Sequence, residues 1–128
     1  MSIFHDQAEF MKAAGKCTPE PEGSYRKEEE LLAQTLIEEE YRELGNEDFY
    51  YQTNSPDAIK EALDLIYVTA QYLNVTIGPD KAKECWDALQ ENNMSKCVDG
   101  KLVKREDGKV LKPEGYKKLD LGEILERQ

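Results

Sequence analysis

The sequence is poor in the residues that build zinc sites and disulfide frameworks. It has three cysteines and one histidine among 128 residues, and Cys17, Cys85 and Cys97 lie far apart with no C-x-x-C pair. Structural zinc sites are recognised by paired Cys or His ligands at short spacing, so these cysteines and His5 exclude a site of that kind. Unpaired cysteines suit a reducing compartment.

Long apolar segments are also absent. The first ten residues, MSIFHDQAEF, contain no basic stretch followed by an apolar one, which a secretory signal would need. No apolar run approaches the length of about 20 residues that spans a membrane. We therefore expect a cytoplasmic protein with no membrane partner.

Positive charge is scarce. The chain has 17 Lys and Arg residues against 27 Asp and Glu residues, a formal net charge of −10. This charge repels the phosphate backbone, so we expect no nucleic-acid polymer as a partner. The window from Lys96 to Lys118 is nevertheless basic, with eight basic and four acidic residues. A carboxylate-rich body with a basic tail suits an anionic ligand that arrives with cations, although chance clustering more often causes such asymmetry.

Helix-starting and helix-ending residues divide the chain into short elements. A chain of 128 residues has room for one domain, 1–128, whose tail, 97–128, we expect to be extended. Ser55-Pro56 is a strong helix start, and Gly45-Asn46 and Gly78-Pro79 are breaks. Asp-Gly turns at Asp99 and Asp107 predict a small β-ribbon, so the fold class is all-α with a short C-terminal ribbon. The predicted helices cover Ile3–Ala14, Tyr25–Leu44, Pro56–Leu73 and Pro79–Asn92.

Two of these helices carry acids on faces that should enter the core. On the second helix, the row through Leu32 and Leu36 continues to Glu39 or Glu40 and then to Glu43. The third helix is apolar on nearly all sides, yet Glu61 and Asp64 lie on the row that continues through Leu65 and Val68. Ionised carboxylates among such neighbours are costly unless a cation or hydrogen-bond donors satisfy them.

Three explanations for these acids remain open. The bland one is a solvated, Glu-rich helix surface. The second is neutralisation by basic side chains, but only Arg42 and Lys60 lie between Tyr41 and Asp80. The third is a divalent metal, which takes oxygen ligands and leaves open positions to substrate phosphates. The pattern favours the metal.

The acidic motifs and three further segments resemble a known family. The helix LIEEEYREL matches L-I-x-E-E-x-x-E-L, and EALD matches E-x-x-D, of the all-α nucleoside triphosphate pyrophosphohydrolases, the MazG-like group. The segments FMKAAG, NMSK and REDGKVLK are similar to the opening helix and the tail of phage and bacterial members, so the resemblance covers most of the chain. The matching residues are 36–44, 61–64, 10–15, 93–96 and 105–112.

The resemblance implies an enzyme that hydrolyses a nucleoside triphosphate between the α- and β-phosphates, with deoxynucleotides expected over ribonucleotides. A triphosphate cannot approach several carboxylates unaided, so Mg²⁺ or Mn²⁺, two or more ions per site, is the expected cofactor. Either Glu39 or Glu40 is expected to activate the attacking water. The proposed metal ligands are Glu39, Glu40, Glu43, Glu61 and Asp64.

Tail residues are candidates for contacts with the nucleotide. Lys96, Lys109 and Lys112 have the charge to stabilise a leaving pyrophosphate, although a solvated ribbon that resists edge pairing explains them equally well. Asn93 is suited to reading a base edge or to capping the preceding helix. Three aromatic residues, Phe10, Tyr67 and Trp86, are suited to stacking on a base, but aromatic residues at helical spacing more often belong to the core.

The resemblance also implies a four-to-five-helix bundle that assembles as a homodimer or homotetramer, in the host cytoplasm if the protein is phage-encoded. The chain departs from the family at Lys16, where Gln is common, at Asn92, where Ser is frequent, and at Lys117-Lys118, which replaces a Pro-rich stretch. Two rival functions remain: a phosphoribosyl-ATP pyrophosphohydrolase, which shares the helices and the bond cleaved, and a non-enzymatic acidic helical module that binds a basic partner.

Overall fold

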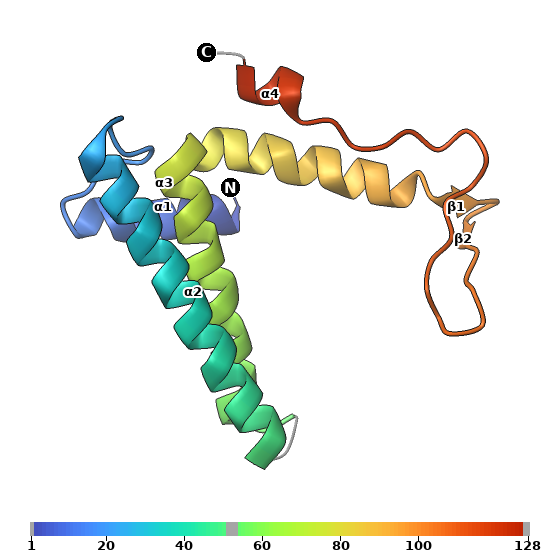
Figure 1. The fold of residues 1–128 in the computed structure, drawn as a ribbon, viewed down its shortest axis with the longest axis horizontal. Coiled ribbons are helices and arrows are strands. Elements are labelled where there is room, and N and C mark those ends of the chain that lie inside the picture. The colour runs from blue at the N-terminus through green and yellow to red at the C-terminus, as the bar shows by residue number, and fades with distance from the viewer. Residues whose placement is uncertain (1, 51–53, 127–128) are drawn as a thin grey trace. The chain divides into compact units, whose positions relative to one another are not determined.

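The protein is mostly helical, as predicted. The computed structural model describes residues 2–50 and 54–126, in which four helices and one two-stranded antiparallel sheet are found (Figure 1). The chain forms two compact units, 1–82 and 83–128, hereafter the first and second units. The elements are α1 (Ile3–Ala13), α2 (Ser24–Tyr50), α3 (Pro56–Met94), β1 (Cys97–Val98), β2 (Lys101–Leu102) and α4 (Gly122–Glu126).

The ends of α1 follow from its capping residues. The Ser2 side chain accepts a hydrogen bond of 3.3 Å from the backbone N–H of His5, which satisfies one free donor of the first turn. The helix ends at Ala13 with Ala14 as its C-cap, and Gly15 follows with φ +80°, the left-handed conformation that glycine adopts at low cost. The predicted first helix is therefore confirmed to within one residue.

In the first unit, α2 and the first part of α3 lie side by side and run in opposite directions (Figure 1). Near the start of α2, the Arg26 guanidinium donates a 2.6 Å hydrogen bond to the carbonyl of Thr76. Toward the other end of α2, Glu40 lies beside Glu61, near the start of α3. This antiparallel pairing brings the two acidic motifs together.

The core of the first unit lies where α1 meets α3. Phe4 is 4% exposed and packs with Ala70 and Ala82, and the half-buried Leu73 and Ile77 pack against them. Small alanines at these positions let the helix backbones approach closely. The core is thus concentrated near α1.

Two helix boundaries in the first unit test the predicted breaks. The predicted end at Gly45-Asn46 is wrong, because α2 continues through both residues to Tyr50. One glycine inside a helix costs only about 1 kcal/mol relative to alanine, which does not by itself stop a helix. Gly78 does interrupt α3, with φ 83° and ψ 162°, so the predicted break before Pro79 is confirmed.

The second unit contains the predicted ribbon and one element that the sequence did not predict. β1 pairs with β2 around Asp99 and Gly100, and a further antiparallel bridge joins Lys104 to Val110 around the second Asp-Gly turn. The β-ribbon is therefore confirmed. The tail is not extended throughout, because Gly122–Glu126 forms the short helix α4.

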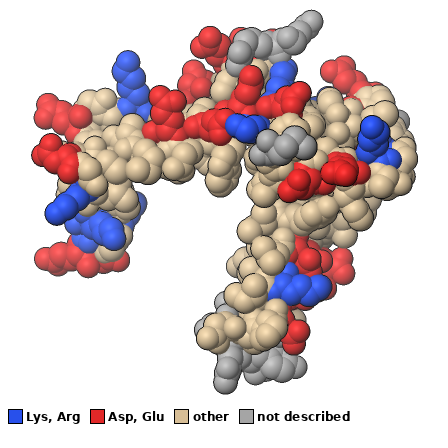
Figure 2. Space-filling view, turned by 180° about the vertical axis from the view of Figure 1, so that it is seen from behind, with Lys and Arg blue, Asp and Glu red and all other residues tan. Residues whose placement is uncertain are grey.

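The surface reflects the composition. On the face shown in Figure 2, acidic side chains are spread over the visible surface with basic side chains among them. Within the described part of the chain, no helix combines the length and the apolar character needed to cross a membrane.

Candidate metal site

The buried face of α2 leads directly to one acidic residue. Glu29 and Ala33 are buried, at 8% and 0% exposure. Glu40 is half-buried and lies on the same face, about two helical turns after Ala33. Leu32, on which the predicted row depended, is 43% exposed, so that row is displaced by one residue. Of the two glutamates that could continue the row, Glu40 lies on the buried face and Glu39 is exposed.

Glu40, Glu43 and Glu61 form a carboxylate cluster between α2 and α3, hereafter the acidic triad. One carboxylate oxygen from each residue lies within 4.8 Å of the other two. Glu40 and Glu43 come from adjacent turns of α2, and Glu61 comes from α3. The structure therefore brings together three of the five predicted metal ligands.

Two oxygens of the acidic triad are buried and lack hydrogen-bond partners within the described residues. These are Oε2 of Glu40 and Oε2 of Glu61. A buried acceptor without a donor is costly, and the cost is greatest when the group carries charge. Neither of these two oxygens therefore has a hydrogen-bond donor among the described residues.

The pKa values of the triad reflect the same crowding. Burial, with the nearby charge of Glu43, raises the pKa of Glu40 to about 7 from the ordinary value of 4.5. The neighbouring Glu61 carboxyl raises the pKa of Glu43. Burial and the neighbouring carboxyl groups together thus disfavour the charged forms of Glu40 and Glu43.

Lys60 compensates part of this charge, at the edge of the triad. Its Nζ lies 2.7 Å from Oδ2 of Asp64 and 3.7 Å from Oε1 of Glu61. Asp64 therefore pairs with Lys60 and stays outside the triad, and Glu39 is also outside it. Neutralisation by a basic side chain thus accounts for Asp64 but leaves Glu40 and Glu43 without such a partner among the described residues.

The triad fits a hard divalent cation. All of its donors are carboxylate oxygens, which Mg²⁺ and Mn²⁺ prefer, and the two unpartnered buried oxygens supply acceptor positions that a cation can occupy. Three carboxylates also leave coordination positions for water and phosphate oxygens.

Two of the four predicted tail residues lie beside the Tyr116 ring in the second unit, and a third, Asn93, contacts one of them. The ammonium groups of Lys96 and Lys112 lie 5.8 and 5.6 Å from the centroid of the Tyr116 ring. Asn93 is exposed, and its side-chain oxygen accepts a weak 3.4 Å hydrogen bond from Lys96. Lys109 is elsewhere, in the turn of Asp107 and Gly108, where its backbone N–H donates to Asp107.

The aromatic candidates do not belong to the core of a single chain. Phe10 is 58% exposed, Tyr67 39% and Trp86 52%. Phe10 and Tyr67 pack edge to face, with ring centroids 5.8 Å apart. The expectation that these aromatic residues are core is wrong for the single chain.

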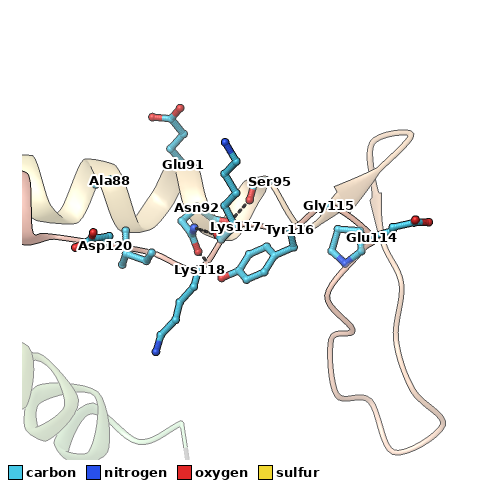
Figure 3. A pocket seen from close by; sticks show the side chains of 12 residues that line it. Ala88, Glu91, Asn92, Ser95, Glu114, Gly115, Tyr116, Lys117, Lys118 and Asp120 are labelled. Carbon is cyan, nitrogen blue, oxygen red and sulfur yellow. Dashed lines mark hydrogen bonds between the residues drawn. The ribbon is translucent and has the colours of Figure 1, made fainter.

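Sequence reasoning missed a second pairing, made by the tail with the end of α3. The side chain of Asn92 accepts a 2.7 Å hydrogen bond from the Tyr116 hydroxyl and donates a 2.8 Å hydrogen bond to the carbonyl of Lys117 (Figure 3). The only sequence signal was that Asn92 and Lys117 are both positions where the chain departs from the family that it resembles.

Comparisons with known proteins add no family assignment. No protein-family model matches the chain, and a comparison with curated proteins finds no significant match.

Proposed function

We propose that the protein is a metal-dependent nucleoside triphosphate pyrophosphohydrolase, which releases a nucleoside monophosphate and pyrophosphate. The observation that carries the proposal is the acidic triad, with its two buried and unpartnered oxygens. Oxygen-only clusters of this kind suit Mg²⁺ or Mn²⁺ that bridges to substrate phosphates. The resemblance to the MazG-like family supplies the reaction class and the expected preference for deoxynucleotides.

Charge balance assigns roles to the acids. Glu40, Glu43 and Glu61 would hold the first ion, which when bound polarises phosphate oxygens and offsets the charge of the substrate. Asp64 is separated from this group by its ion pair with Lys60, so it becomes a ligand only when that pair opens. Binding of two or more ions would supply the attraction that opens it.

The two glutamates proposed for water activation differ in position. Glu40 belongs to the triad, and a carboxylate that binds a cation is a weak proton acceptor. Glu39 is exposed and outside the triad, so its carboxylate remains free to accept a proton from water. We therefore assign Glu39 as the base and Glu40 as a ligand.

The exposed apolar residues of α3 support a homodimer or homotetramer. Ile59, Leu63 and Ile66 are 51%, 60% and 49% exposed at helical spacing, and the Phe10–Tyr67 pair is exposed as well. The first part of α3 was predicted to have apolar residues on nearly all sides. In a single chain, other helices of the same chain cover only one of its faces. A second copy would bury the other face, because exposed apolar patches of this kind commonly mark interfaces.

The decisive experiment measures pyrophosphate release at matched Mg²⁺ across the eight common nucleoside triphosphates, dUTP and phosphoribosyl-ATP. Release should disappear in Glu43→Gln and Asp64→Asn with the fold retained. Glu39→Gln should lose hydrolysis but keep metal binding, whereas Glu40→Gln should lose both. Glu38→Gln is the matched control, because Glu38 is exposed and pairs with Arg42 at 3.2 Å.

The outcomes separate the rival functions. Full activity in Glu43→Gln and Asp64→Asn would contradict the proposal. Release of pyrophosphate from phosphoribosyl-ATP and from no other substrate would favour a phosphoribosyl-ATP pyrophosphohydrolase. An absence of release from all substrates, with Mn²⁺ present, would leave the acidic interaction module.

A further inference from the structure

The loop that joins α1 to α2, residues 14–23, docks on the break in α3 within the first unit. In a continuous helix the carbonyl of Val75 would accept a hydrogen bond from Pro79, which has no N–H. This carbonyl accepts instead from the backbone N–H of Glu20, at 3.0 Å. The Pro19 ring lies against the glycine of the break, where a Cβ would be 3.0 Å from the ring carbon Cδ. The loop therefore fills the break and satisfies a carbonyl that the break leaves free.

The docked loop buries the carboxyl group of Glu20. The residue is 3% exposed, and its Oε1 is buried with no hydrogen-bond partner among the described residues. A buried carboxylate in this position is costly, whereas a protonated carboxyl group carries no charge to desolvate. The backbone of Glu20 holds the loop to α3, so the docking of the loop and the burial of this carboxyl group occur together.

The basic side chains near Glu20 are engaged by other acceptors. Lys16, in the same loop, donates from Nζ to both carboxylate oxygens of Glu29 on α2, each at 2.7 Å. Arg26 on α2 donates to the carbonyl of Thr76 at 2.6 Å and to the carboxylate four residues later on its own helix at 3.1 Å. Glu20 therefore has the buried carboxylate of Glu29 as a neighbour, and the cation between them is bound to Glu29.

The charged groups around Glu20 favour its neutral form. Burial and then the charge of Glu29 raise the pKa of Glu20 above its ordinary value of 4.5, and Lys16 offsets only part of this rise. The hydrogen bond to Glu29 raises the pKa of Lys16, so Lys16 stays charged, and Tyr25 at the start of α2 is a further titratable group that interacts with it. On the α3 side, Glu20 meets the uncharged backbone of Val75.

We propose that Glu20 is a proton switch for the loop 14–23: the protonated carboxyl group keeps the loop docked on the break in α3, and its ionisation releases the loop. On release, the proton passes to solvent and the carboxylate becomes hydrated. The carbonyl of Val75 then loses its hydrogen bond to the loop. The proposal requires neither a metal ion nor a nucleotide, so it goes beyond the proposed function and does not depend on it.

The direction of the pH dependence follows from the linkage of protonation to docking. A carboxyl group whose pKa is raised in the docked state stabilises docking fully below its ordinary pKa of 4.5. This stabilisation is lost as the pH rises through the pKa of the docked state. The ion pair of Lys16 with Glu29 predicts the opposite direction, because protonation of Glu29 at low pH would break the pair. The sign of the pH dependence therefore distinguishes the two.

Hydrogen exchange of the Glu20 amide tests the proposal, followed by NMR on the full chain without metal or nucleotide. The quantity compared is the protection factor, the intrinsic exchange rate divided by the observed rate, so that the pH dependence of the intrinsic rate cancels. Release of one proton on undocking should lower the protection about tenfold per pH unit above pH 4.5, until the pH passes the pKa of docked Glu20.

Three variants assign the effect to Glu20. Glu20→Gln is neutral at every pH and nearly isosteric, so its protection should stay constant from pH 4.5 to pH 8. Glu22→Gln is the matched control, because Glu22 is exposed in the same loop, and it should keep the dependence of the wild type. Glu40→Gln removes the other buried carboxyl group with a raised pKa, and should also keep it if the loop opens locally.

A direct titration of the wild type covers the case in which Glu20→Gln does not fold. The chemical shift of the Glu20 carboxyl carbon should titrate with a midpoint above 4.5, and a midpoint at or below 4.5 would overturn the proposal. Three exchange results would overturn it as well: protection in the wild type that is constant or rises with pH, a dependence in Glu20→Gln as steep as in the wild type, or a dependence that disappears in Glu40→Gln.

Discussion

Glu40 on α2 and Glu61 on α3 each bury one carboxylate oxygen, Oε2, that has no hydrogen-bond partner among the residues described. The two residues lie 21 positions apart in sequence and meet because α2 and α3 are antiparallel. A pair of this kind is unfavourable in the metal-free protein. We therefore expect the stability of the first unit to increase when a cation binds to this pair.

Added Mn²⁺ should raise the thermal stability of the protein. A ligand that binds only the folded state at about 100 times its dissociation constant contributes about 2.7 kcal/mol. The increase in melting temperature, followed by circular dichroism, should be lost in Glu40→Gln and in Glu61→Gln. Glu38→Gln should keep the full increase. An unchanged increase in all three variants would place the cation elsewhere.

The stability of the metal-free protein should fall as the pH rises from about 4.5 to about 7. The pKa of Glu40 is about 7 in the folded protein and near 4.5 when unfolded, so the folded state binds more protons in this window. The loss attributable to Glu40 is about 1 kcal/mol after allowance for solvent screening. Urea unfolding at pH 5 and pH 8 measures it.

Glu40→Gln should make this pH dependence smaller, because the variant has no proton to lose at that position. Glu38→Gln should leave it unchanged. A slope as steep in Glu40→Gln as in the wild type would show that Glu40 has an ordinary pKa. In the wild type, Mn²⁺ affinity should rise with pH through about 7, since the proton and the cation compete for Glu40.

Lys60→Gln should tighten the binding of Mn²⁺ several-fold. Lys60 places a positive charge 2.7 Å from Asp64 and 3.7 Å from Glu61, and its removal leaves both carboxylates to the cation. Lys83→Gln is a matched control, because Lys83 also forms a 2.7 Å ion pair with an aspartate four residues later, Asp87, but in the second unit. Weaker binding in Lys60→Gln would mean that Lys60 orients the ligands.

Gly78→Ala should destabilise the protein by about 1 to 3 kcal/mol. Gly78 has φ +83°, and a Cβ there would lie 3.0 Å from Cδ of Pro19. Gly45→Ala should instead stabilise α2 by up to about 1 kcal/mol, because Gly45 is helical and a Cβ there meets no atom within 4 Å. Urea unfolding of both variants measures the difference, and a loss of stability in Gly45→Ala would argue that α2 ends at this glycine.

Leu63→Lys should convert the proposed oligomer to a monomer with little loss of helix content, since Leu63 is 60% exposed in the single chain. Light scattering gives the mass. Val103→Lys, at a residue 50% exposed in the second unit, should leave the mass unchanged. A monomeric mass for the wild-type protein would remove the oligomer proposal.

The helix starts and the ribbon could be predicted because local side chains determine them. The Ser55 hydroxyl accepts a 3.1 Å hydrogen bond from the N–H of Ala58, which is the capping contact expected of Ser before Pro. The end of α2 could not be predicted from Gly45, because helix continuation depends on packing as well as on the local residue. The same is true of the buried row on α2, where the choice between Leu32 and Ala33 depends on the partner helix.

The acidic triad could be predicted in part. Sequence spacing placed acids on two helices, and the resemblance named five of them, but only the pairing of α2 with α3 determines which three meet. Asp64 was expected among the ligands. Its ion pair with Lys60, four residues earlier on the same helix, could have been predicted from the sequence spacing. The contact between Asn92 and Tyr116 joins residues 24 apart and has no local sequence signal.

The buried amides between α1 and α3 determine how the first helix docks. Asn74 is fully buried, and its Nδ2 donates 2.8 Å hydrogen bonds to the carbonyl of Phe4 and to Oε1 of Gln7. If α1 slid by one turn, about 5.4 Å, these donors and acceptors would be left unpaired inside the protein. Hydrogen bonds require specific donor and acceptor atoms, so these contacts select a single register. The position of the first helix is therefore determined by hydrogen-bond matching as well as by the burial of Phe4 and Met11.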